Sequence, residues 1–268
     1  MNLLPASRLM ALLLPAAMLP AAAQAQGFAA YISPPRFEVQ ADAGKPLRQV
    51  LEIQHVGQQK GNYRVYTADW TFNPDNSVSF STELAPDSCR PWVAIERREL
   101  SIEPGARYRY RFEINPPAGT PPRECRFALM VEGLDPAKVQ GAISFPVGGR
   151  IGVIVYAAIG GAAPQLSIST QQVVQVNGKP TATLDVRNTG NAHGRLEGFV
   201  NGTDAAGTQF EMSPADLPIL PGETRRVALS PVPENGKTAP EIRFPLSVKG
   251  SLEWGANRLP LDARFAAP

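Results

Sequence analysis

The sequence has few of the side chains on which metal binding and most enzyme chemistry depend. Its 268 residues include two histidines and two cysteines. His55 and His193 each lie near a glycine and outside any known metal-binding pattern, so we interpret both as polar surface residues. A phosphate-binding glycine loop and a nucleophile elbow are missing too. We therefore expect a protein that is not an enzyme, with no catalytic residue, no bound metal and no cofactor.

An excess of one charge is also missing. Lys and Arg number 26 and Asp and Glu number 24, which gives a formal net charge of +2. Proteins that bind nucleic acid usually carry a strong basic excess, so this balance argues against a nucleic-acid partner. Apolar runs of the roughly 20 residues that a membrane-spanning helix requires are lacking as well.

The N-terminus has the organisation of a signal peptide. Arg8 precedes an apolar run over residues 9–19, and Ala23-Gln24-Ala25 has the small-x-small form of a cleavage site. The alternative is a membrane anchor, but Pro15 interrupts the short run and Pro20 follows it. We expect a signal peptide over residues 1–25, export to the periplasm, and no membrane span after cleavage.

The two cysteines are expected to form a disulfide. Cys89 and Cys125 are an even pair in a chain that is predicted to be exported, and such pairs are usually oxidised. The rival interpretation is a pair of buried free thiols.

Short alternating segments separated by turn residues predict an all-β protein. Segments with β periodicity or continuous apolar character occur at residues 63–70, 108–114, 126–132, 150–156, 181–186, 196–200 and 225–229. Trp70, Trp92 and Trp254 lie within such patterns and are expected to pack in cores. Residues 160–164, which are rich in Gly and Ala, break the pattern. We predict two immunoglobulin-like β-sandwich domains, over residues 26–160 and 161–268, after a cleaved signal peptide.

The segment before residue 150 allows two interpretations. Ile143, Phe145 and Val147 alternate with Ser144 and Pro146, so the three apolar side chains share one face of an extended segment. An ordinary edge strand would turn this face onto its own core. Alternatively, the segment is an edge that pairs with another chain by strand addition. The residues alone leave both open.

Several motifs resemble the PapD-like periplasmic chaperones that assemble pili and fimbriae. The matching pieces are Ile32–Val39 with Arg36, Arg90–Val93 continuing to Leu100–Gly105, Glu124–Leu129, and Arg150–Tyr156. The resemblance covers most of residues 31–160. It implies a chaperone that binds incomplete pilin or fimbrial subunits by donating a strand and delivers them for assembly, with an outer-membrane usher as a further partner.

The resemblance also implies site residues. Ile143, Phe145 and Val147 would be the donor-strand residues, and Arg36 would anchor the carboxylate of the subunit. The position of the family's second cleft cation, a lysine, is Gly152 here, so Arg150, two residues away on the same face, is the candidate substitute.

Two further positions depart from the family pattern. Tyr156 stands where the family has a cleft arginine, and Pro146 removes one backbone donor from the donor strand. The alternative function is a secreted structural or adhesive surface protein with the same fold and no pilin client.

Overall fold

The computed structural model describes residues 28–135, 137–138, 146–233 and 238–267. These residues form strands almost throughout, with one short 3-10 turn over Arg90–Trp92. The predicted signal peptide and two of the proposed donor residues, Ile143 and Phe145, lie outside the described residues. In the described part of the chain, no helix is long and apolar enough to cross a membrane.

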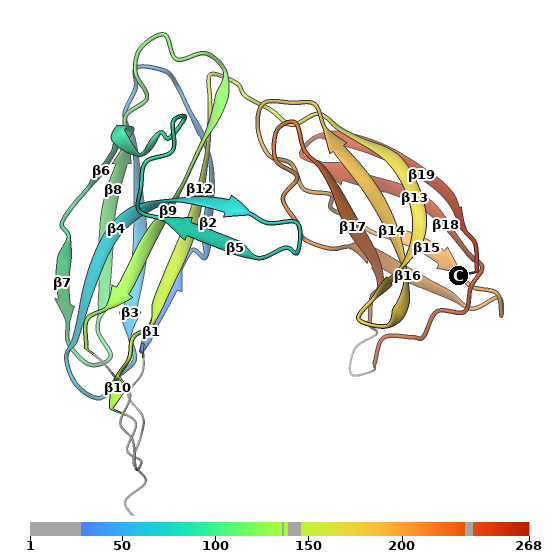
Figure 1. The fold of residues 1–268 in the computed structure, drawn as a ribbon, viewed down its shortest axis with the longest axis horizontal. Coiled ribbons are helices and arrows are strands. Elements are labelled where there is room, and N and C mark those ends of the chain that lie inside the picture. The colour runs from blue at the N-terminus through green and yellow to red at the C-terminus, as the bar shows by residue number, and fades with distance from the viewer. Residues whose placement is uncertain (1–27, 136, 139–145, 234–237, 268) are drawn as a thin grey trace, which may run out of the picture.

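The first half of the chain forms two sheets packed face to face (Figure 1). One sheet has the order β1 (Ala30–Ser33), β3 (Leu47–His55), β8 (Arg107–Ile114) and β6 (Val93–Ile95). The other has the order β2 (Arg36–Ala41), β12 (Arg150–Ile159), β9 (Arg123–Gly133), β4 (Gly61–Phe72) and β5 (Val78–Ser81), and β7 (Glu99–Ile102) also pairs with β4. The short strands β10 (Ala137–Lys138) and β11 (Pro146–Val147) pair with each other.

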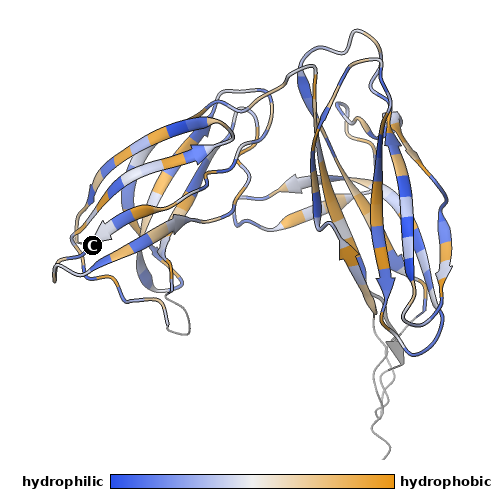
Figure 2. Cartoon of the chain, turned by 180° about the vertical axis from the view of Figure 1, so that it is seen from behind, coloured by the Kyte–Doolittle hydropathy of each residue, from blue (hydrophilic) through white to orange (hydrophobic). Residues whose placement is uncertain are grey.

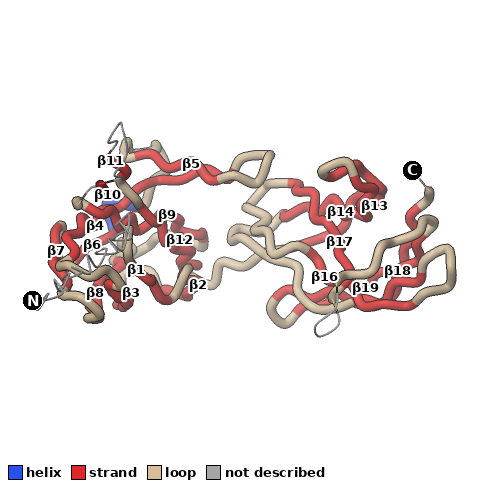
Figure 3. Tube along the Cα trace, turned by 90° about the horizontal axis from the view of Figure 1, so that it is seen from below, coloured by secondary structure: helices blue, strands red, loops and turns tan. Residues whose placement is uncertain are grey.

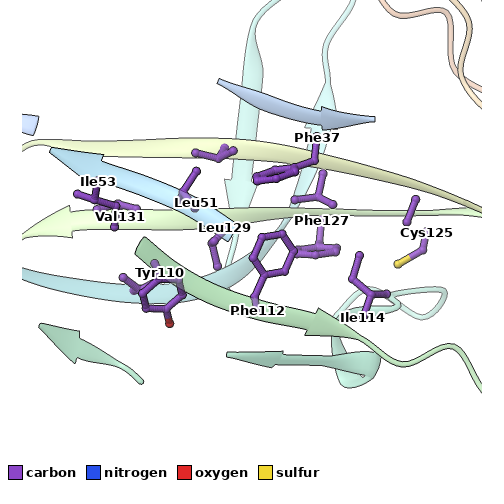
Figure 4. Close-up of a cluster of buried hydrophobic side chains, with 14 of the residues drawn as sticks. Phe37, Leu51, Ile53, Tyr110, Phe112, Ile114, Cys125, Phe127, Leu129 and Val131 are labelled. Atoms are coloured by element: carbon purple, nitrogen blue, oxygen red, sulfur yellow. The ribbon is translucent and has the colours of Figure 1, made fainter. Parts of the chain in front are cut away.

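Alternation along the strands decides which side chains enter the core. In β8, Tyr110, Phe112 and Ile114 are buried, while Arg109 and Arg111 are exposed and Glu113 is half-buried. Phe112 meets Phe37 and Phe127 edge to face, and Figure 4 shows these rings between the sheets. The predicted disulfide is confirmed, because Cys89 and Cys125 are bonded, with their Cα atoms 5.7 Å apart.

The second half forms another sandwich with its own core. Its strands have the order β13 (Leu166–Val176), β14 (Lys179–Asn188), β17 (Thr224–Pro231), β16 (Gln209–Pro214), β15 (Val200–Thr203), β18 (Leu246–Trp254) and β19 (Asn257–Phe265). The strand predicted over residues 196–200 is wrong, since β15 begins only at Val200. Gly198 has a positive φ of 93°, and only isolated bridges form at Gly194 and Glu197 before it.

Two separate hydrophobic clusters accompany the two sandwiches. The first extends from Phe37 to Ile159 and the second from Leu166 to Phe265. The hydropathy colouring of Figure 2 alternates along many of the strands, and Figure 3 shows the two sandwiches arranged end to end. The predicted fold class, all-β with two immunoglobulin-like sandwiches, is confirmed.

Candidate cleft between the two domains

The outer face of the first domain carries charged residues toward the second domain. Strands β2 and β12 run parallel, and their register places Arg36 beside Ile154 and Glu38 beside Tyr156. Phe37 and Val155, which alternate with these residues, belong to the core between the sheets. The side chains of Arg36, Glu38 and Tyr156 therefore leave the sheet on the opposite face.

A buried asparagine fixes the loop of the second domain that meets this face. The Asn188 side chain donates to the carbonyl oxygens of Ala192 and Ile219, at 2.8 Å each. Its own oxygen accepts from the backbone N–H groups of Gln165 and Gly190. With both ends of the amide satisfied, the loop is held where it presents His193 and Arg195 to the first domain.

Two arginines from different domains hold one carboxylate. Arg36 Nη1 lies 2.9 Å from Asp216 Oδ2, and Arg195 Nη1 lies 2.7 Å from Asp216 Oδ1. Both arginines also contact Glu38 Oε1 through Nε, at 2.8 Å and 3.2 Å. Although partial burial of Asp216 acts to raise its pKa, the Arg36 bond and the Arg195 charge lower it. The cluster joins the two domains through alternating charges.

His193 lies beside the same charged cluster between the domains and not on the surface. Its side chain is 9% exposed, and its Nδ1 is 2.5 Å from Glu124 Oε2, which also accepts from the His193 backbone N–H. Its Nε2 is 3.6 Å from Glu38 Oε1, and the ring stacks on Tyr156 with centroids 3.7 Å apart. The interpretation of His193 as a surface residue is therefore wrong.

The same interpretation is wrong for His55, which is 5% exposed inside the first domain. Its ring nitrogens meet the Tyr63 hydroxyl and the Gln59 carbonyl. Gly57 and Gly61 leave room for the ring, since a Cβ at either glycine would come within 2.7 Å of it. His55 is thus a satisfied core residue.

A cavity of about 340 Å³ opens beside this cluster. Residues of both domains line it, among them Glu38, Gln40, Tyr156, His193, Arg195 and Trp254. Small buried residues form one side of the cavity, namely Ala158, Ala162 and Ala192. The cavity is therefore polar where the domains meet and apolar near the segment that connects them.

The proposed anchor residues share one face of the β12 sheet but are not adjacent. Arg150 precedes the Arg36-paired residue Ile154 by four positions, which is about 13 Å along a strand. Gly152 lies between them, and a Cβ there would be 2.5 Å from Cζ of Phe80. An aromatic ring of β5 thus occupies the space over Gly152, where the resemblance places the family's cleft lysine.

In the described part of the chain, one edge of β12 is unpaired at residues 150–153, next to the segment that the resemblance suggests as a donor strand. Strand β9 pairs with all of Arg150–Ile159, whereas β2 pairs only with Ile154–Ile159. Among the described strands, none pairs with the other edge of residues 150–153. Val147, the third proposed donor residue, lies just before this stretch in β11.

A second contact between the domains lies away from the cleft. Arg225 of β17 is 6% exposed and donates to the carbonyl of Asn73 and the side chain of Asn76 at the tip of the β4–β5 hairpin. Its guanidinium also lies 3.9 Å from the Phe72 ring centroid. In Figure 1 this hairpin extends from the first sandwich to the second.

Sequence reasoning missed most of these residues, because they come from distant parts of the chain. Glu38, Glu124, His193, Arg195 and Asp216 meet only after both sandwiches have formed. In the described residues, no group of three or more His, Cys, Asp or Glu could hold a metal ion.

Comparison with known proteins gives similarity at the level of structure. No family model matches the chain, and no curated protein sequence matches it. The crystal structure of the class 5 fimbriae chaperone CfaA is similar with a TM-score of 0.47 and 11% identity, over 89% of this chain and 100% of that one. The chaperone–subunit complex CsuC–CsuE of Acinetobacter baumannii is similar with a TM-score of 0.45 and 14% identity, over 88% of this chain and 97% of that one.

A third structure is the SafB chaperone of Salmonella enterica with the SafA pilin, at a TM-score of 0.46 and 10% identity, over 89% of this chain and 97% of that one. These three structures contain fimbrial chaperones. They belong to the class of protein whose motifs the sequence resembles. At this distance we transfer no residue role from them.

Proposed function

We propose that the chain is a periplasmic chaperone for pilus or fimbrial subunits. It binds an incomplete subunit by strand addition and delivers it to an outer-membrane usher. The observation that carries this proposal is the open edge of β12 at residues 150–153, directly after the apolar donor segment with Ile143, Phe145 and Val147. An unpaired edge beside apolar side chains is a site where an extended segment of another chain adds as a strand.

The position of Arg36 supports a carboxylate anchor at the other end of that edge. Its guanidinium already contacts Glu38 and Asp216, so the position suits an anion. Asp216 is 62% exposed, and an exposed ion pair contributes only about 0–1 kcal/mol, so a subunit carboxylate can displace it. We propose Arg150 as the second cation, on the same face.

Co-expression with products of neighbouring genes, followed by purification from the periplasm, tests the proposal. The variants are Arg36→Ala, Arg150→Ala and Phe145→Asp. The matched control is Arg48→Ala, because Arg48 is 84% exposed on the other sheet of the same domain and pairs with Glu113. We expect wild type and the control to retain a small β-rich subunit that all three variants lose.

The expected loss for Arg36→Ala is about 10- to 100-fold in affinity, as for a hydrogen bond to a charged group. Equal binding by all variants would refute the assignment of the strand and of the anchor. No binding by wild type would favour a structural or adhesive surface protein that uses the same two sandwiches.

A further inference from the structure

His193 connects the second domain to two carboxylates of the first. Its Nδ1 faces Glu124 Oε2 at 2.5 Å, and its Nε2 faces Glu38 Oε1 at 3.6 Å. These carboxylates belong to different strands, β9 and β2. Only an imidazolium has an N–H on both ring nitrogens, whereas a neutral ring has one N–H and one lone pair. A neutral His193 would therefore turn a lone pair toward a carboxylate oxygen.

Burial makes this mismatch costly. The Glu124 side chain is 2% exposed, and its Oε1 has no hydrogen-bond partner among the described residues. Its nearest cation besides His193 is Arg126, whose Nε is 3.8 Å from Oε1. A buried carboxylate with so few partners depends strongly on each charge that remains near it.

We propose that His193 is a pH-sensitive clasp between the two domains, which holds Glu38 and Glu124 together as an imidazolium and releases one of them when the ring loses its proton. The proposal does not depend on a pilus subunit, since every group in it belongs to this chain.

The groups around the ring determine the direction of the pH effect. Glu38, Glu124 and Arg126 face it from β2 and β9, and Tyr156 covers it from β12. From the second domain, Arg195 shares Glu38 with it, and Asp216 of that domain and Arg36 of β2 complete the charged cluster. Burial acts to lower the pKa of His193, but the hydrogen bond to Glu124 and the nearby carboxylate of Glu38 outweigh it and raise the pKa above its ordinary value of 6.5.

A raised pKa means that protonation favours the clasped form. The stabilisation of the clasped form by the His193 proton is fully present below about pH 6.5, which is the pKa of the ring in the open form. It is lost as the pH rises through the raised pKa of the clasped form. For each pH unit that separates the two pKa values, the ratio of the clasped to the open form is about tenfold smaller at a pH above both values than at a pH below both. Glu38 is charged in both forms. Its contact with His193, despite partial burial, lowers its pKa to about 2 in the clasped form, and its ordinary value of 4.5 still lies below this pH range.

The test combines an imidazole NMR titration with ¹⁵N relaxation of the purified two-domain chain. The chain has two histidines, so His193→Gln assigns both resonances. We expect His193 to titrate above pH 6.5, with the domains tumbling as one body below its midpoint and more independently above it. His193→Gln and His193→Phe, which keeps an aromatic ring over Tyr156, should show the independent tumbling at every pH.

A second variant keeps the test informative if the substitutions at His193 disturb folding. Glu124→Gln should lower the midpoint of His193, because it removes the carboxylate that faces Nδ1. A His193 midpoint at or below 6.5, a midpoint that Glu124→Gln does not move, or tumbling that is the same on both sides of the midpoint would each overturn the proposal.

Discussion

The glycine at position 152 gives the sharpest prediction about the outer face of β12. A Cβ built at Gly152 would lie 2.5 Å and 2.7 Å from the ring atoms Cζ and Cε1 of Phe80, and 3.0 Å from Sδ of Met130. Comfortable carbon contacts are about 3.5–4.0 Å long, so Gly152→Ala must push the ring by roughly 1 Å. Phe80 packs there with Ala68, Ala128 and Met130.

Two opposing effects determine how much Gly152→Ala changes the free energy of unfolding. Overpacking a filled site costs about 1–3 kcal/mol. Replacing a strand glycine by alanine without strain stabilises a protein by about 0.4–1 kcal/mol, because the unfolded chain loses freedom. We therefore expect Gly152→Ala to lower the free energy of unfolding by up to about 2.5 kcal/mol. In a Phe80→Ala background the same change should be neutral or stabilising.

A double-mutant cycle in urea, with the disulfide intact, measures this coupling. The signal must come from the first domain, since two domains need not unfold together. Gly148→Ala is the matched control, because a Cβ there meets nothing within 4 Å. If Gly152→Ala lowers the free energy of unfolding equally in the Phe80 and Phe80→Ala backgrounds, the Phe80 ring does not pack against this glycine. Gly152→Lys, which adds a larger side chain at the same place, should be at least as destabilising as Gly152→Ala.

Three other predictions follow from contacts described above. Replacing Cys89 and Cys125 by serine should cost the first domain about 4 kcal/mol for a separation of 36 residues, measured by urea unfolding, and an unchanged midpoint would contradict the entropy argument. Arg225→Ala should speed hydrogen exchange at the hairpin amides of Asn76 and Ser77, whereas Arg226→Ala should not, since Arg226 pairs with Asp185 inside its own domain. The free energy of unfolding should fall as the pH drops from about 4.5 toward 2, because Glu38 takes up its proton in this range. Glu38→Gln should flatten this part of the curve of stability against pH, and an unchanged slope would rule out Glu38 as its source.

Period-two patterns were sufficient to predict the fold class. Tyr110, Phe112 and Ile114 lie in the core because they alternate with charged residues, and the apolar run after Arg150 becomes a strand covered on both faces. Residues 196–200 have the period-two pattern but form no strand before Val200, because Gly198 adopts a positive φ that periodicity does not encode.

The charged cluster between the two domains could not be predicted in the same way. The resemblance pointed to Arg36, and the structure places it in the cleft, but its partner Asp216 lies 180 residues later in the chain. His193 follows a turn, where a surface position is the ordinary expectation. It is buried only because the second domain closes on Tyr156 and Glu124 of the first. The roles proposed for Arg36, Arg150, Ile143, Phe145 and Val147 all remain predictions.

The hairpin that meets Arg225 has a mechanical consequence. Two bodies joined at one point can rotate about it in every direction, but two bodies joined at two points can turn only about the line through both. The connecting segment supplies one point, and the contact of Arg225 with Asn73 and Asn76 supplies another. The cluster around Glu38 and His193 acts as a third, lateral support. If the proposed clasp at His193 opens while the other two contacts hold, the motion left to the domains is a rotation about the line through those two contacts.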